Sequence, residues 1–299
     1  MAINKILVTG GAGFIGSNLA LELERQNHEV TILDNFSFGN KENLKNFKGK
    51  IINTDFSENF FIEGDFDVIF HQAAITDPRY PNDNEMLEKN INGFNSVVNF
   101  AKKKNAKLIY ASTAGLYGNG SVPMEEDQKK EILSVYGRSK LIMDHLASKH
   151  FKDMHIVGLR YFNVFGPGES YKGRPASMIY HLAKQMLKGE KPKIFKNGEQ
   201  KRDHIYVKDV VDATIKATNA KSGIYNVGTG VATSFNELVE ILNEIIGTNL
   251  EPVYFDMPYN SKTYQFNTHA DITKAEKELG FKAKYSLKEG IKEYLEVLK

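Results

Sequence analysis

The sequence feature that most constrains the fold is a glycine-rich turn near the N-terminus, in residues 5–24 (KILVTGGAGFIGSNLALELE). Its opening apolar run is too short for a helix and predicts a buried strand. Gly10, Gly13 and Gly16 follow at regular intervals, and residues 18–24 then have the composition and apolar spacing of a helix. Glycines allow a sharp turn and leave backbone N–H groups uncovered at the positive end of the helix dipole. The segment is therefore typical of a strand–turn–helix site for a dinucleotide diphosphate.

A carboxylate at the end of the next predicted strand supports this interpretation. Residues 30–33 predict that strand, and it ends at Asp34, at the distance along the chain expected of the residue that binds the ribose 2′-hydroxyl. The alternative is an ordinary loop residue. A free carboxylate favours NAD because it would repel the 2′-phosphate of NADP. Lys41 lies close enough in the sequence to weaken that preference, so NADP stays open.

Length and composition set the limits of what this chain can be. Its 299 residues are enough for one large or two medium domains, and a net charge of +2 with 25% charged residues gives no case for nucleic acid or an anionic membrane. The chain has no cysteine, which excludes disulfides and zinc–thiolate sites, and we expect no metal. No apolar stretch approaches the roughly 20 residues that span a bilayer. The N-terminus enters a predicted strand without room for a signal peptide, so we expect a cytoplasmic protein.

Strands and helices alternate through the first half of the chain. Further strands are predicted at residues 51–55, 67–74, 107–113 and 155–162, with a helix at 85–104. Such alternation predicts an α/β fold, a Rossmann-type doubly wound parallel sheet with right-handed crossovers. Ligands of these sheets bind at the carboxyl ends of the strands. We therefore expect Gly10, Gln72 and Thr113 to lie close together at that end of the sheet. His71, at the end of its strand, is expected to be a packed residue and not a base.

A second chemical cluster is the segment YGRSK, which contains Tyr136 and Lys140 and opens a predicted helix. Residues four apart share a helix face, so the phenol and the ammonium should be neighbours. A nearby cation stabilises phenolate, and we expect it to lower the pKa of Tyr136 from its ordinary value near 10. Such a pair is common on helix surfaces. Following a glycine turn and a strand that ends in Thr113, it indicates acid–base chemistry.

Beyond Pro167 the pattern changes to that of a smaller α/β substrate lobe, interleaved with the main sheet. A helix at 205–218 and a strand at 223–228 return to the sheet, and the lobe is predicted to hold a helix at 177–187, a strand at 193–195 and helices at 235–246 and 287–298. We therefore expect an NAD(P)-binding domain of residues 1–166 plus 204–230, and a substrate-binding lobe of residues 167–203 and 231–299.

Arg202 lies in a basic turn of this predicted lobe, in the segment GEQKRD. A guanidinium can bind a diphosphate with two parallel hydrogen bonds. The alternative is a structural ion pair with Asp203 or Asp209.

Four segments, TGGAGFIG, ASTAGLYG, YGRSK and RYFNVFGP, occur in the order in which they mark the extended short-chain dehydrogenase/reductase family, and the chain resembles its sugar-nucleotide epimerases and dehydratases over nearly its whole length. The resemblance implies that Tyr136 and Lys140, with Thr113, move a proton while NAD or NADP takes a hydride. It further implies one tightly bound cofactor per chain, a nucleotide-sugar substrate and a homo-oligomer. The cofactor contacts expected on this basis are Gly10, Gly13, Phe14, Ile15, Gly16, Asp34, Asn35, Lys41, Asp55, Gln72, Ala73, Ala74, Asn90, Lys140 and Val164.

Further segments, RYFNVFGPGESYKG, ASMIYH, GEQKRDHIYVKDV and KTYQ, resemble one subgroup, the ADP-L-glycero-D-manno-heptose 6-epimerases. In that subgroup the lysine corresponding to Lys172 is a second acid–base group that faces the tyrosine across the sugar. A plain loop lysine is the alternative. Two residues differ from the pattern of that subgroup. Arg174 stands where some members have a small residue with a hydroxyl group. Asp34 favours NAD, although the heptose 6-epimerases are usually associated with NADP. The substrate contacts implied are Asn163, Lys172, Arg174, His181, Phe195, Lys196, Asn197, Arg202 and Tyr264.

The expected function is therefore epimerisation of a nucleotide sugar through a transient ketone. The hydride leaves one face of the sugar carbon and returns to the other. The sugar therefore binds in two poses, and its oxygen loses its proton in one pose and regains a proton in the other. Tyr136 and Lys172 would each serve one pose, with Thr113 donating a hydrogen bond to that oxygen. The closest alternative is a UDP-glucose or UDP-N-acetylglucosamine 4-epimerase, in which Lys172 only lines the pocket. A non-catalytic NAD(P)-binding protein is the alternative from another class. Ala114 and Gly115 stand where related dehydratases carry an Asp-Glu pair, which disfavours elimination.

Overall fold

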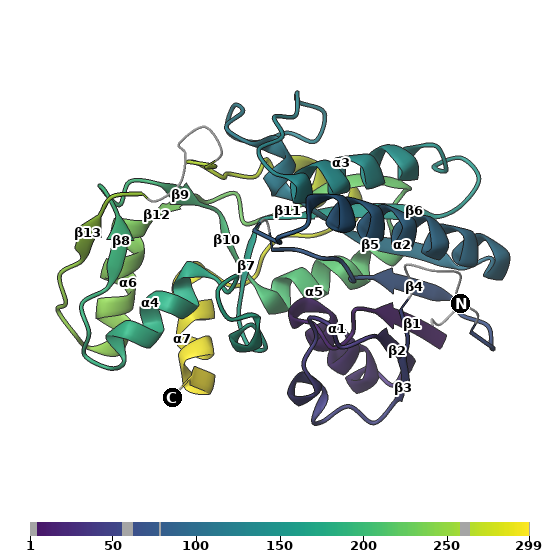
Figure 1. Ribbon diagram of the computed structural model, residues 1–299, viewed down its shortest axis with the longest axis horizontal. Coiled ribbons are helices and arrows are strands. Elements are labelled where there is room, and N and C mark those ends of the chain that lie inside the picture. The colour runs from purple at the N-terminus through teal and green to yellow at the C-terminus, as the bar shows by residue number, and fades with distance from the viewer. Residues whose placement is uncertain (1–4, 56–61, 78, 258–263, 299) are drawn as a thin grey trace.

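A seven-stranded parallel sheet is the central element of the computed structural model, which describes residues 5–55, 62–77, 79–257 and 264–298 (Figure 1). Its strand order is β11-β6-β5-β4-β1-β2-β3. The order reverses between β1 and β4, which is where ligands bind in open α/β sheets. This confirms the predicted fold class. The strands are β1 (Lys5–Thr9), β2 (Glu29–Asp34), β3 (Lys50–Asn53), β4 (Val68–His71), β5 (Lys107–Thr113), β6 (Ile156–Tyr161) and β11 (Gly223–Val227).

Helices cover both faces of the sheet (Figure 1). Helices α1 (Phe14–Arg25) and α5 (Val207–Lys216) pack on one face, and α2 (Asp83–Lys104) and α3 (Val135–Ser148) pack on the other. Side chains alternate along a strand, so Ile6 and Val8 of β1 enter the core with α1 and α5 while Leu7 enters the core with α2 and α3. All three are fully buried, which is why the strand reads as a continuous apolar run.

A second group of elements has a core of its own and lies at the left of Figure 1, on the side of β7, which follows directly after β6. Phe165, Ile179, Leu182 and Phe235 are among the buried residues of that core. Its helices are α4 (Met178–Met186), α6 (Phe235–Ile246) and α7 (Leu287–Leu298). Three small sheets accompany them: β7 (Asn163–Phe165) with β10 (His204–Tyr206), β9 (Lys201–Arg202) with β12 (Thr233–Ser234), and β8 (Lys193–Phe195) with β13 (Val253–Phe255).

The sequence predictions differ from the structure at a few element ends. The predicted helix at 205–218 was wrong at its start, because residues 204–206 form β10 and α5 begins only at Val207. Pairing of these residues with β7 decides their conformation, and such pairing is not visible in local sequence. Lys262 and Thr263 of the segment KTYQ lie outside the described residues. The short helical turns are η1 (Lys41–Leu44), η2 (Ala114–Tyr117), η3 (Ser170–Lys172), η4 (Ala217–Asn219) and η6 (Ala275–Leu279).

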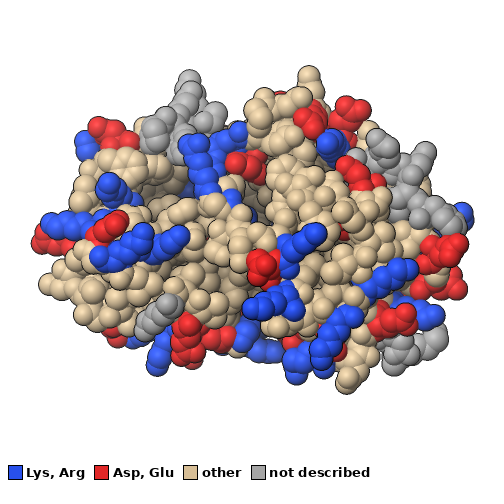
Figure 2. Space-filling view, turned by 60° about the horizontal axis from the view of Figure 1, so that its bottom comes forward, with Lys and Arg blue, Asp and Glu red and all other residues tan. Residues whose placement is uncertain are grey.

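Acidic and basic side chains are interspersed over the face shown in Figure 2, in keeping with the small net charge. In the described parts of the chain, no helix combines the length and the apolar character needed to cross a membrane.

Candidate active site

The glycine turn after β1 forms a cradle of backbone N–H groups. Gly10 has a φ of +68°, and a Cβ there would come within 2.6 Å of the backbone nitrogen of Ala73. A Cβ at Gly16 would collide with the carbonyl oxygen of Gly10. Helix α1 begins after Gly13, which provides no capping side chain. The first-turn N–H groups of α1 therefore have no partner inside the helix and are available to an anion, as the sequence predicts.

Asp34 stands at the end of β2, beside this cradle. Its carboxylate accepts hydrogen bonds from the backbone N–H of Ala12, at 2.9 Å, and of Phe36, at 2.8 Å. Burial raises the pKa of the Asp34 carboxyl, and the two backbone hydrogen bonds act in the opposite direction. Asp34 is thus fixed next to the glycine turn, in the position expected of a ribose-binding carboxylate.

Asn35, Asp55 and Lys41 are further predicted cofactor contacts near Asp34. Asn35 donates a hydrogen bond of 3.1 Å to Asp55, which joins the ends of β2 and β3. Lys41 begins η1, and its Nζ lies 5.4 Å from the centre of the Phe36 ring. The ammonium is therefore near the Asp34 loop but contacts an aromatic ring.

Gln72, directly after β4, shows whether a dinucleotide fits at the carboxyl end of the sheet. Its Oε1 accepts a hydrogen bond of 3.3 Å from Tyr161. Its Nε2 is buried and has no partner among the described residues. A buried donor without a partner is costly, and a ligand lying across Gly10 and Gln72 would satisfy it. The glycine cradle, Asp34 and this orphaned amide together fit a dinucleotide.

Three of the residues predicted to contact the cofactor also have contacts within the protein. Asn90 is buried on α2 and uses both side-chain N–H groups within the protein, on the carbonyl of Ile75 and on the hydroxyl of Ser139. It thereby ties the segment after β4 to α3. Lys140 is buried, and its Nζ donates to the carbonyl of Ala111 at 2.8 Å. Val164 lies partly buried on β7, between the two cores.

Tyr136, Lys140 and Thr113 come together at the carboxyl end of β5. Ser134 caps α3 by accepting a hydrogen bond from the N–H of Gly137, so Tyr136 lies in the first turn of the helix. The Nζ of Lys140 is 5.9 Å from the centre of the Tyr136 ring. Thr113 accepts from the N–H of Gly115 at 3.0 Å and hydrogen-bonds the Tyr136 side chain. The predicted neighbourhood of these three residues is confirmed.

The expected direction of the Tyr136 pKa shift was wrong. Burial raises the pKa of Tyr136 to about 12, although the hydrogen bond from Thr113 acts to lower it. Burial also lowers the pKa of Lys140 to about 8, against the raising effect of the Asp144 carboxylate. Removal from water penalises the charged form of each group, and this effect exceeds the expected attraction between phenolate and ammonium. Tyr136 therefore carries its proton at neutral pH.

A buried polar network that the sequence analysis missed holds α3 against the sheet. The Asp144 carboxylate accepts hydrogen bonds of 2.9 Å from Arg160 on β6 and from Tyr110 on β5. Arg160 also donates to the hydroxyl of Tyr117, at 2.8 Å. Asp144 is one helical turn beyond Lys140, and that spacing is the only sequence signal that could have pointed to it. The network fixes the helix that carries Tyr136 and Lys140.

Lys172 and Arg174 lie in the loop between β7 and α4, which is anchored by a residue that the sequence analysis also missed. Glu169 is fully buried and accepts hydrogen bonds from Gly166 and, through the backbone N–H and the hydroxyl, from Ser177. Lys172 is exposed, with its Nζ 5.6 Å from the centre of the Phe14 ring at the start of α1. Desolvation lowers the pKa of the Lys172 ammonium, while Glu169 and Asp77 act to raise it.

Arg202 is buried beside aromatic rings, outside the main sheet. Its guanidinium lies 5.2 Å from the ring centre of Tyr264 and 5.7 Å from that of Phe235. It donates to the carbonyls of Lys201, Phe266 and Gln265. The alternative of an ion pair with Asp203 or Asp209 was wrong, because Asp203 accepts from Thr229, Gly230 and Ala270, and Asp209 accepts from Lys284 and Tyr285.

The other predicted substrate contacts each have a partner within the protein. Phe195 packs edge-on against Tyr264, with ring centres 5.9 Å apart. Lys196 forms an exposed ion pair of 2.8 Å with Asp256. The three remaining residues are Asn163, which accepts from Thr268; His181, whose ring approaches the Arg174 carbonyl; and Asn197, whose carbonyl accepts from Asn236.

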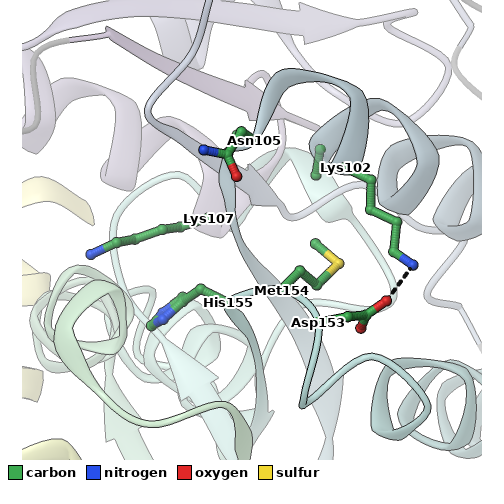
Figure 3. Close-up of a pocket in the computed structure, with 8 residues that line it drawn as sticks. Lys102, Asn105, Lys107, Asp153, Met154 and His155 are labelled. Carbon is green, nitrogen blue, oxygen red and sulfur yellow. Dashed lines mark hydrogen bonds and ion pairs between the residues drawn. The ribbon is translucent and has the colours of Figure 1, made fainter.

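A separate cavity of about 320 Å³ lies away from this chemistry (Figure 3). It is found where β5 and β6 begin, at the opposite end of the strands from Tyr136, and it contains the ion pair between Lys102 and Asp153. Lys107 and His155 extend away from that pair in the close-up view. Within the described residues, no group of three or more His, Asp or Glu side chains is placed to hold a metal ion.

Comparison with known proteins gives a family and a set of close relatives. The model of the NAD dependent epimerase/dehydratase family matches residues 6–228. ADP-L-glycero-D-manno-heptose-6-epimerase of Brachyspira hyodysenteriae is 37% identical over 98% of this chain and 97% of its own length. A Methanocaldococcus jannaschii protein provisionally named a UDP-glucose 4-epimerase is 38% identical over 98% of both chains. The crystal structure of Helicobacter pylori ADP-L-glycero-D-manno-heptose-6-epimerase has a TM-score of 0.91 and 39% identity, covering 99% of this chain and 96% of that one.

Proposed function

This chain belongs to the NAD-dependent epimerase/dehydratase family and is a sugar-nucleotide epimerase, and from that premise we propose that it inverts the 6-position of an ADP-glycero-manno-heptose. The observation that carries the proposal is that Tyr136, Thr113 and Lys140 lie together at the carboxyl end of the sheet, where the glycine cradle also lies. In this arrangement a sugar carbon could lie between a proton-transfer group and a nicotinamide.

The cofactor in this proposal is NAD, tightly bound and one per chain. When bound, it supplies the redox chemistry by taking a hydride from a carbinol carbon of the sugar and returning it to the opposite face. The first-turn N–H groups of α1 bind the diphosphate, Asp34 binds the ribose and Gln72 donates from its orphaned Nε2.

Tyr136, Thr113 and Lys172 are the residues that we assign to proton transfer at the sugar oxygen. Tyr136 holds its proton at neutral pH and can give it to the ketone oxygen in the pose in which the hydride returns, and Thr113 then stabilises the phenolate by donating a hydrogen bond to it. Lys172 serves the other pose, in which its neutral amine takes the proton of the sugar hydroxyl as the hydride leaves. Although the Lys172 side chain is exposed overall, local desolvation of its ammonium beside the Phe14 ring lowers its pKa, which makes the loss of a proton easier than for an ordinary lysine.

The substrate side of the proposal uses the elements outside the main sheet. We assign residues 167–203 and 231–299 to substrate binding and residues 1–166 with 204–230 to the dinucleotide. Arg202 binds the diphosphate of the sugar nucleotide, between the rings of Tyr264 and Phe235.

A second candidate function is that of a UDP-hexose 4-epimerase. The 38% identity to the Methanocaldococcus jannaschii protein supports it as strongly as the 37% identity to the Brachyspira hyodysenteriae protein supports the heptose 6-epimerase. Incubation of the purified protein with ADP-D-glycero-D-manno-heptose and, separately, with UDP-glucose tests both. Chromatography or NMR of the sugars follows the approach to equilibrium. We expect conversion of the heptose at the faster rate. Faster conversion of UDP-glucose would replace the proposed substrate, and conversion of neither sugar would refute this assignment.

Asp34→Asn tests the preference for NAD. The substitution removes the negative charge that opposes a 2′-phosphate, so the ratio of the NADP and NAD dissociation constants should fall by roughly tenfold. Lys41→Ala should move the ratio in the other direction, because it removes a cation beside the Asp34 loop. Titration of protein freed of cofactor measures both constants. A ratio that neither substitution changes would show that Asp34 does not contact the ribose.

A further inference from the structure

The imidazole of His204, on β10, is the feature that the proposed function leaves unexplained. It is only 5% exposed, and neither Nδ1 nor Nε2 has a hydrogen-bond partner among the described residues. A buried polar group without a partner destabilises the fold, so two orphaned nitrogens on one ring point to a partner that arrives with a ligand.

The alternation of side chains along residues 202–206 shows which way His204 faces. Asp203 and Ile205 point toward the main sheet, because Asp203 accepts from Thr229 and Gly230 and Ile205 belongs to the core with α5. Tyr206 belongs to the core of the second group of elements. Residues two apart on a strand share a face, so His204 lies on that second side, with Tyr206.

The neighbouring strand brings another predicted substrate residue beside His204. Strands β10 and β7 are parallel, and His204 is in register with Asn163. Asn163 is held by the hydroxyl of Thr268, which donates to its Oδ1 at 2.9 Å. Arg202, at the end of β9 two residues earlier, acts electrostatically on His204, which places the guanidinium nearby. His204 therefore lies near Arg202, which we assign to the diphosphate, and beside Asn163, a predicted substrate contact.

The protonation state of His204 limits what it can bind. Burial lowers its pKa to about 3, and the positive charge of Arg202 acts in the same direction. The ring is therefore neutral at physiological pH, with one N–H donor and one acceptor nitrogen. A phosphate oxygen could satisfy only the donor. A hydroxyl group both accepts and donates, so it can satisfy the donor nitrogen or the acceptor nitrogen.

We infer that His204 is a substrate-binding residue whose neutral imidazole hydrogen-bonds a hydroxyl group next to the diphosphate of the nucleotide sugar. This inference rests on the proposed function, since it needs a nucleotide sugar beside Arg202 and Asn163. The hydroxyl belongs either to the transformed sugar or to the ribose of the nucleotide, and both present the same chemistry.

Two substitutions at His204 and one control test the inference. His204→Phe keeps a flat ring but no polar atom, and His204→Gln keeps one donor and one acceptor group. His155→Phe is the matched control, because His155 lies at the opposite end of the sheet, by the cavity of Figure 3, and donates to the carbonyl of Ala217. Calorimetric titration of each holoprotein with ADP-D-glycero-D-manno-heptose, UDP-glucose, ADP and UDP gives the dissociation constants without relying on turnover.

We expect His204→Phe to weaken binding of the matching sugar nucleotide by roughly tenfold, His204→Gln to recover part of the loss, and His155→Phe to change nothing. If the nucleoside diphosphate binds as before, the hydroxyl is on the transformed sugar; if it weakens equally, the hydroxyl is on the ribose. Unchanged binding in His204→Phe would overturn the inference. A wild-type protein that binds a sugar nucleotide but does not epimerise it would refute the proposed function alone, and one that binds no sugar nucleotide would refute both.

Discussion

Replacing Tyr136 by phenylalanine is expected to lower kcat by about a thousandfold, the loss typical of removing a general acid–base group. The ring and its position in the first turn of α3 are kept, but the hydroxyl that Thr113 contacts is gone. Because the glycine cradle and Asp34 are untouched, the bound NAD content should not change. Initial rates of epimerisation, together with the nucleotide released on denaturation, measure the two effects.

Tyr225→Phe is the matched control for this variant. Tyr225 is also buried, and its hydroxyl donates to the carbonyl of Lys221, at 2.9 Å, far from the edge that carries Tyr136. It loses the same atom together with contacts to Lys221 and Glu278, so its melting temperature should fall at least as far as that of Tyr136→Phe while its kcat stays normal. Near-normal kcat in Tyr136→Phe would mean that another group carries the proton.

Lys172→Met is the second substitution with a large expected effect, a loss of about a hundredfold or more in kcat. Methionine keeps an unbranched chain of similar length that can still lie against Phe14, but it removes the ammonium. NAD binding should persist. Lys282→Met removes an exposed lysine that is paired with Glu276, and it should leave kcat unchanged.

The Lys172 variant also separates the two candidate substrates. Full activity in Lys172→Met would refute the two-base assignment, and it would favour the 4-epimerase, in which Lys172 only lines the pocket. Its effect should appear in kcat more than in KM, because a proton-transfer group acts in the transition state. A change confined to KM would instead make Lys172 a binding residue.

The sequence by itself determined the fold class and the position of the main chemical groups. The apolar run before Gly10 and the alternation of strands and helices predicted the parallel sheet, because burial on both faces leaves an unbroken apolar pattern. The spacing of Tyr136 and Lys140 predicted that they would be neighbours, because helix geometry is local. The resemblance to sugar-nucleotide epimerases and dehydratases predicted the family, which the matched family model confirms.

Only the tertiary structure decided how the environment acts on these groups. Burial raises the pKa of Tyr136, where the sequence predicted a lowering, because desolvation depends on what surrounds a side chain and not on its spacing along a helix. The partners of Arg202 and Asn90 depend on residues distant in the chain, and so does the lack of partners for the His204 nitrogens among the described residues. Local patterns fix which element a residue joins, whereas hydrogen bonding and desolvation are fixed only when those elements pack together.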